Sequence, residues 1–112
     1  MALIVIIAVA AIRIFGEGAT VERDGLTYAG PALAQALDGA PAAPGSRVLE
    51  RFVVGQAPCR AFLGSHVSGI ACRERGGWHL RLIRDGVDLE DPAAVASLER
   101  DLRAAAVGMK AQ

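Results

Sequence analysis

The fold is decided by residues 59–72, which read CRAFLGSHVSGIAC. Opposed residues of an antiparallel hairpin have position numbers with a constant sum, so a pairing of Cys59 with Cys72 places the turn between Ser65 and His66. An independent turn signal lies at the same two residues, and β-prone residues flank it. We therefore predict a β-hairpin over this stretch, with the two cysteines directly opposed.

The cysteine pair, the only two cysteines in the chain, could form a disulfide in that register. Cross-strand Cβ atoms lie about 4.5 to 5.5 Å apart, slightly beyond the usual disulfide distance, so a closer, non-hydrogen-bonded pair is required. A bridge that closes a loop of about fifteen residues would stabilise the fold by roughly 3 kcal/mol and would indicate an oxidising compartment. The alternative is two free buried thiols in a cytosolic protein.

Turn-forming residues divide the rest of the chain into short elements. Asp24-Gly25 predicts a hairpin over residues 21–28, and Pro31 and Gly39 delimit a helix of about two turns. Four β-prone runs, bounded by turn signals, then form an antiparallel meander: residues 48–54, 59–64, 67–75 and 78–84.

The clearest helix is predicted at the C-terminal end. Asp91 is a good N-cap, Pro92 suits the first helical position, and Gly108 is a suitable stop. Apolar residues recur at helical spacing: Val95, Leu98, Leu102 and Ala105 or Ala106. This stripe most simply faces the core, with a groove for a partner helix as the alternative. The expected fold class is α+β, an antiparallel meander with a short helix before it and an amphipathic helix after it.

A hydrophobic run precedes this domain. Residues 2–12 carry no charge, and Arg13 follows. The run at 1–15 is short for a bilayer core, which needs about 17 to 20 apolar residues, unless Arg13 snorkels to the interface. A membrane anchor, a buried strand or helix and a cleaved signal remain open. We divide the chain into a hydrophobic segment, 1–16, which is a candidate anchor, and a single domain, 17–112.

Charge and motifs exclude several function classes. The 112 residues hold 12 Lys+Arg and 12 Asp+Glu, so no net charge favours nucleic acid as a partner. Cysteine and histidine occur, but without the close spacing of a zinc knuckle. Ser65-His66 has no orienting carboxylate implied by sequence, and the glycine pairs lack the context of a phosphate-binding loop. We therefore expect no catalytic residue, metal or cofactor.

Arginines gather on the meander around a single tryptophan, and we take five residues as candidate partner-binding residues: Arg60, Arg73, Arg75, Trp78 and Arg81. If Gly76-Gly77 forms a two-residue turn, Arg75 opposes Trp78 and Arg73 opposes Leu80, which allows guanidinium stacking on the indole. The alternative is a solvated sheet edge whose arginines cover apolar surface. The mixture of Arg, Trp and Leu on one face also indicates a bulge or an exposed aromatic side chain.

A family resemblance covers about residues 47–84. Pro58-Cys59-Arg60 with Phe62, then Gly69-Ile70-Ala71-Cys72-Arg73, then Gly76-Gly77-Trp78, is similar to a pattern of exported bacterial domains. These are the surface-antigen outer-membrane lipoproteins and the periplasmic parts of anti-sigma-factor-like membrane proteins. The helix expected at 30–38 resembles, more weakly, the one before the sheet in the anti-sigma-like group. The resemblance implies a small sheet domain outside the cytoplasm, tethered to a membrane, with no catalytic residue.

These observations lead to one functional expectation. The chain is expected to be a non-enzymatic, membrane-tethered periplasmic or envelope domain that acts through protein contacts, with membrane contact through residues 1–15. A small accessory subunit of a larger membrane complex is the alternative. An enzyme or ligand carrier whose site the sequence does not reveal is the third class.

Overall fold

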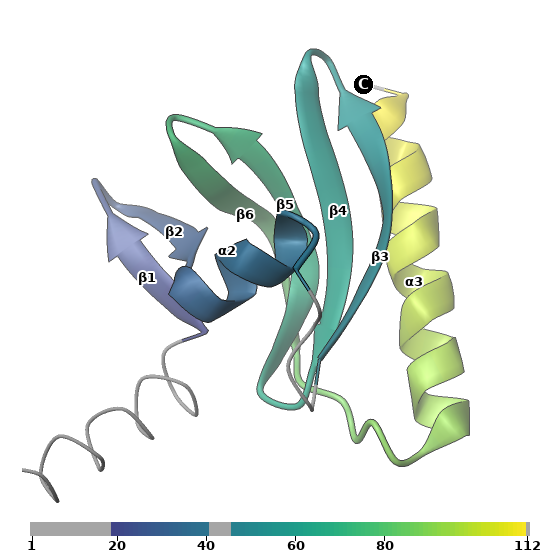
Figure 1. Ribbon diagram of the computed structural model, residues 1–112. Coiled ribbons are helices and arrows are strands. Elements are labelled where there is room, and N and C mark those ends of the chain that lie inside the picture. The colour runs from purple at the N-terminus through teal and green to yellow at the C-terminus, as the bar shows by residue number, and fades with distance from the viewer. Residues whose placement is uncertain (1–18, 41–45, 112) are drawn as a thin grey trace, which may run out of the picture.

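The computed structural model describes residues 19–40 and 46–111, which form a six-stranded antiparallel sheet and two helices (Figure 1). The predicted α+β class is therefore confirmed. The elements in chain order are β1 (Thr20–Arg23), β2 (Leu26–Ala29), α2 (Pro31–Leu37), β3 (Ser46–Val54), β4 (Ala57–Gly64), β5 (Val67–Glu74), β6 (Gly77–Asp85) and α3 (Pro92–Lys110). The hydrophobic run at 1–15 lies outside the described residues.

The strand order is β1-β2-β6-β5-β4-β3. Strands β3 to β6 form the predicted meander, and β1 and β2 form the predicted hairpin, with Asp24 and Gly25 at positive φ in its turn. The hairpin joins the meander at β6, where Tyr28 pairs with His79. The connection that contains α2 leads from β2 across one face to β3 at the opposite edge (Figure 1).

The central hairpin has the predicted register. Cys59 pairs with Cys72 and is bonded to it through sulfur, with the two Cα atoms 4.0 Å apart. So short a separation is that of the non-hydrogen-bonded kind of pair, which a cross-strand bridge requires. Both cysteines are fully buried. The turn lies at Ser65-His66, between β4 and β5, as predicted.

The sheet has an apolar core on each face because alternate residues of a strand point to opposite sides. One core lies under α3 and includes Cys59, Leu63 and Ile70. The other lies under α2 and includes Phe62 and Ala71. The disulfide belongs to the core on the α3 side. Figure 1 shows the two helices on opposite sides of the sheet.

Helix α3 begins as predicted and ends later. The Asp91 carboxylate accepts hydrogen bonds from the backbone N–H groups of Ala93 and Ala94, at 3.1 and 3.2 Å, which caps the helix. The prediction that Gly108 stops the helix is wrong, because α3 continues to Lys110. The last turn packs on the sheet, with the Lys110 ammonium 5.8 Å from the centre of the Phe52 ring. These tertiary contacts outweigh the low helix propensity of glycine.

The turn between β5 and β6 differs from the predicted one. Arg75 and Gly76 occupy it, with φ of 56° and 77°. Arg73 therefore pairs with Trp78, and both predicted pairings, Arg73 with Leu80 and Arg75 with Trp78, are wrong. The predicted proximity of arginine and indole is present in another form, since the Arg73 guanidinium carbon lies 5.9 Å from the centre of the Trp78 ring.

Gly77 belongs to β6 and is not part of the turn. A Cβ at this position would lie 3.0 Å from a ring carbon of Tyr28, so the close approach of the tyrosine favours glycine here. A β-bulge follows, since Ile70 pairs with Leu82 while Ala71 pairs with Leu80, which leaves an extra residue in β6. The sequence indicated a bulge or an exposed aromatic, and the structure has the bulge.

Candidate functional site

The structure distributes the predicted arginine cluster over two faces of the sheet. Arg60, Arg73 and Trp78 lie on the α2 side, as their alternation with the core residues shows. Arg81 lies on the α3 side, bonded to Glu74, and Arg75 lies in the β5–β6 turn. The five residues therefore do not form one patch, although Arg73 and Trp78 do lie together. Their partner-binding role stays a prediction.

Arg60 links two elements of the fold. Its Nε donates to the Leu49 carbonyl at 2.8 Å, and its Nη1 donates to the Leu37 carbonyl at 3.2 Å. Leu49 lies in the irregular part of β3, between Val48 and Arg51, and Leu37 is the last residue of α2. Carbonyls at bulges and helix ends lack regular partners, so Arg60 satisfies groups that the fold leaves unpaired.

Trp78 is buried under α2, with only 3% of its surface exposed. Its Nε1 donates to Asp38 Oδ1 at 2.9 Å, and Arg73 Nη1 donates to the same oxygen at 3.0 Å. Asp38 is the C-cap residue of α2. The indole therefore holds the end of the helix against the sheet and offers almost no surface to a partner.

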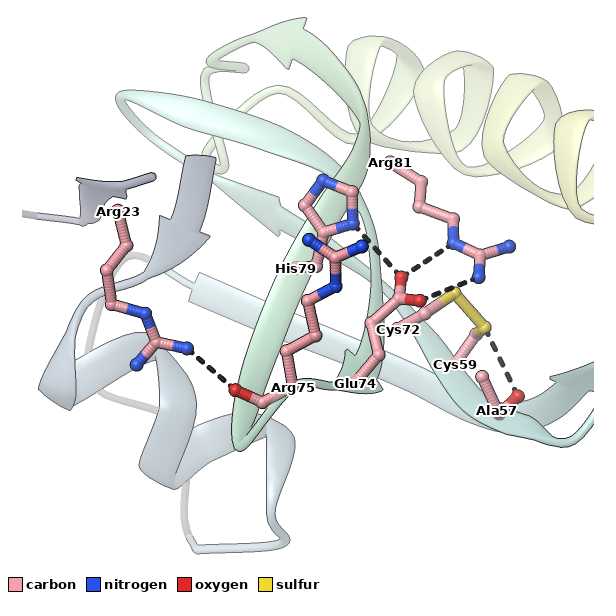
Figure 2. A network of polar contacts seen from close by, with 8 residues as sticks. All are labelled: Arg23, Ala57, Cys59, Cys72, Glu74, Arg75, His79 and Arg81. Carbon is pink, nitrogen blue, oxygen red and sulfur yellow. Dashed lines mark hydrogen bonds and ion pairs between the residues drawn. A yellow bond between two sulfur atoms is a disulfide. The ribbon is translucent and has the colours of Figure 1, made fainter. Parts of the chain in front are cut away.

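A polar network lies on the opposite face, beside the region that α3 covers (Figure 2). Arg81 donates to both carboxylate oxygens of Glu74, from Nε at 2.9 Å and from Nη2 at 3.0 Å. His79 Nδ1 lies 3.0 Å from Glu74 Oε1. The hydrogen bond from Arg81, together with that from His79, lowers the pKa of Glu74 from its usual 4.5 to about 2, against the opposing effect of partial burial.

An open cavity of about 480 Å³ adjoins this network. Its lining residues come from β2, the β5–β6 turn and the facing strands: Leu26, Glu74, Arg75, His79, Leu80 and Arg81. The Tyr28 ring lies beside it, with its centre 5.5 Å from that of His79, and the Arg23 guanidinium carbon lies 4.2 Å from the centre of the tyrosine ring. The cavity therefore has basic, aromatic and apolar neighbours.

Two members of this network, Glu74 and His79, were not among the predicted partner-binding residues. The predicted turn contained the signal that could have found them, because a two-residue turn at Gly76-Gly77 opposes Glu74 to His79 directly. In the structure, with Arg75 and Gly76 in the turn, His79 pairs with Cys72 and still lies on the same face as Glu74.

The residue types at the site can bind an anion. Both cysteines are in the disulfide, so neither is a nucleophile or a metal ligand. Within residues 19–40 and 46–111, no three His, Cys, Asp or Glu side chains gather in a way that could hold a metal ion. Two of the side chains that line the cavity, Arg75 and Arg81, are cationic hydrogen-bond donors, which are suited to holding an anion.

Comparisons with protein-family models, with curated proteins and with solved structures find no match. The resemblance to exported bacterial domains over residues 47–84 therefore stays a prediction. No helix in the described part of the chain is long and apolar enough to cross a bilayer. The predicted anchor at 1–15 lies outside that part.

Proposed function

We propose that this protein is a non-enzymatic, membrane-tethered domain of the periplasm or cell envelope that acts through protein–protein contacts. The buried disulfide between Cys59 and Cys72 is the observation that carries the proposal. Such bonds form and persist in oxidising compartments and are rare in the cytosol. The resemblance of residues 47–84 to exported envelope domains supports the same compartment.

The setting of the disulfide supports a structural role. Both cysteines are completely buried in the core under α3, among residues such as Leu63 and Ile70. Thiol–disulfide exchange requires a thiolate to reach one of the sulfur atoms, and the packed core prevents this in the folded protein. The bond therefore joins the two central strands and has no role in electron transfer.

The face of the sheet that carries α3 has a covered and an uncovered region, and the uncovered region supports action through protein contacts. α3 packs on β3, β4 and β5, whereas the Glu74 network and its cavity lie at the uncovered β2–β6 side. A rigid polar surface on a disulfide-bonded sheet is a suitable docking surface for another protein. The hydrophobic run at 1–15 is proposed as the tether.

The oxidation state of the cysteines tests the compartment. Protein purified from the membrane or envelope of its natural host should be unfolded and alkylated without reductant, then analysed by mass. We expect no alkylated cysteine, because the sulfur atoms are bonded to each other. The same sample reduced first should carry two alkyl groups, which shows that both thiols can react. Two alkyl groups without reduction would contradict the proposal.

Fractionation tests the tether. The full chain should stay with membranes after washing at high salt and alkaline pH. A variant in which a cleavable export signal replaces residues 1–15 should leave the membrane fraction and keep its disulfide. Full-length protein outside the membrane fraction would contradict the tether. Failure of the variant to form its disulfide would instead indicate that the run belongs to the folded core.

Release in mild detergent distinguishes the proposal from an accessory subunit of a membrane complex. A regulatory or envelope domain should emerge as a folded monomer or in a dissociable pairing. An obligate subunit should copurify with the same large partners at fixed stoichiometry, and that result would replace the proposal with the alternative.

A further inference from the structure

We propose that the cavity beside the β5–β6 turn binds a carboxylate side chain from an acidic segment of a partner protein, held by Arg75 and Arg81. This inference rests on the proposed function, because it names the chemistry of the partner. The cavity lies on the same face of the sheet as α3, at the β2–β6 side that the helix does not cover (Figure 2).

The Glu74 network orients the donors before any ligand binds. Glu74 accepts two hydrogen bonds from Arg81 and one from His79, so neither side chain is free to rotate. The side chains of Glu74, His79 and Arg81 are only 28%, 22% and 32% exposed. Donors fixed in advance lose little conformational entropy on binding, which favours affinity.

Each of these side chains keeps a free hydrogen-bonding group. Arg81 uses Nε and Nη2 on Glu74, which leaves Nη1. An ionised carboxylate only accepts, so the His79 proton lies on Nδ1, which leaves Nε2. Neither Nη1 of Arg81 nor Nε2 of His79 has a hydrogen-bond partner among the described residues.

Arg75 supplies the charge that is not neutralised within the site. Its guanidinium forms no ion pair with any described residue, whereas the charge of Arg81 is matched by Glu74. The backbone of Arg75 is held in place, because Arg23 Nη2 donates to its carbonyl at 2.8 Å. Figure 2 shows the Arg75 side chain extending past Glu74 toward His79.

The charge balance selects an anion. Two arginines, Arg75 and Arg81, line the cavity with one carboxylate, Glu74, although the whole chain has no net charge. Such a local excess attracts negative groups and repels positive ones. The planar guanidinium matches a carboxylate in two parallel hydrogen bonds. Leu26 supplies an apolar wall for the stem of a glutamate side chain.

The size and openness of the cavity favour a partner's side chain. A volume of about 480 Å³ is in the usual range for a ligand site of roughly 300 to 1,000 Å³. The cavity opens on the uncovered side of the sheet, so the residues before and after an inserted glutamate can continue over β2 and β6. A carboxylate carried by an extended segment therefore fits without movement of the fold.

A hexaglutamate peptide tests the site on the purified, disulfide-bonded full chain. Titration into isotope-labelled protein should give saturable NMR shifts centred on the backbone amides of residues 74–81. Substitution Arg75→Glu should weaken binding by about tenfold or more, because a charge-assisted pair becomes a repulsion. Arg100→Glu, on an exposed position of α3, makes the same change in net charge and should leave binding unchanged.

Three outcomes would overturn the inference. They are absence of shifts at residues 74–81 with millimolar peptide, equal weakening by both variants, and free glutamate binding as tightly as the peptide. The last would indicate a small-molecule site. If Arg75→Glu disturbs the whole spectrum, Arg75→Gln replaces it. The titration uses folded protein from any source, so its failure is distinct from failure of the compartment or tether experiments.

Discussion

One face of the sheet contains two regions that differ in burial and in charge. Under α3 lie the disulfide and side chains with no exposed surface, such as Leu63 and Ile70. At the β2–β6 side of the same face lie Glu74 and His79 beside an open cavity. The comparison teaches that the covered region provides stability, whereas the open region presents fixed charges to solvent and is available for recognition.

The difference follows from simple dimensions. A helix with its side chains is about 10 Å wide, and neighbouring strands lie about 4.8 Å apart, so one helix covers two or three strands. The sheet has six strands, and α3 packs on β3, β4 and β5. The rest of the face has no helix over it within the described residues, and charged side chains such as Glu74 and Arg81 lie there beside Leu26 and Tyr28.

Truncation of the covered core should have the largest effect. Leu102 is 1% exposed, and Leu102→Ala should lower the free energy of unfolding by about 4 kcal/mol, because it removes buried methyl groups and leaves a cavity. Val107 on the same helix is 62% exposed, so Val107→Ala should change it by less than about 0.5 kcal/mol. Urea unfolding measures both. Similar losses would mean that α3 does not bury the face we describe.

Removal of the disulfide should have the next largest effect. The bond joins residues 13 positions apart, and a loop of this size restricts the unfolded chain by about 3 kcal/mol. Cys59→Ala with Cys72→Ala should therefore shift the urea midpoint to lower concentration. The reduced wild-type protein should show a similar loss, which checks that the effect is not one of packing alone. An unchanged midpoint in both would contradict the stabilising role.

Acid should weaken the open region selectively. A carboxylate with a depressed pKa contributes stability above its unfolded value, near 4.5, and loses it as the pH falls through its folded value, about 2. Glu74→Gln should cost about 1 kcal/mol at neutral pH, and the difference from wild type should vanish between those two pH values. Glu90→Gln, at an exposed position, serves as the control in the same denaturant series. A pH-independent difference would point to packing as the cause.

The smallest predicted effect concerns the outer hairpin. Arg23 lies over the Tyr28 ring and donates to the Arg75 carbonyl, yet it is exposed. Arg23→Ala should reduce the free energy of unfolding by about 0.5 kcal/mol. Hydrogen exchange should reveal faster opening of β1 and β2 than of β4. An equal increase of the exchange rate in all strands would show that the hairpin and the disulfide-bonded core open as one unit.

Local signals in the sequence predict the covered region well. The symmetry around Ser65-His66 predicts the register that opposes Cys59 to Cys72, and Asp91-Pro92 predicts the start of α3. These features depend on residues close together in the chain. The same is true of the outer hairpin, where Asp24-Gly25 indicates the turn.

The turn and the bulge of the open region could not be predicted, because they depend on how β6 fits between its neighbours. Gly77 lies in β6 against the ring of Tyr28 from β2, and nothing in the sequence around Gly77 reveals that neighbour. Arg81, which pairs with Glu74, is the extra residue of the bulge in β6.

The position of β2 beside β6 also constrains the order in which the chain can fold. Arg23 and the carbonyl that it contacts are 52 residues apart. The protein is synthesised from its N-terminus, so the hairpin of β1 and β2 cannot pair with β6 until β6 has been synthesised. Contacts between such distant residues form slowly. Both the Glu74 network and the attachment of the hairpin require β6, so a chain cut short before residue 77 would lack both.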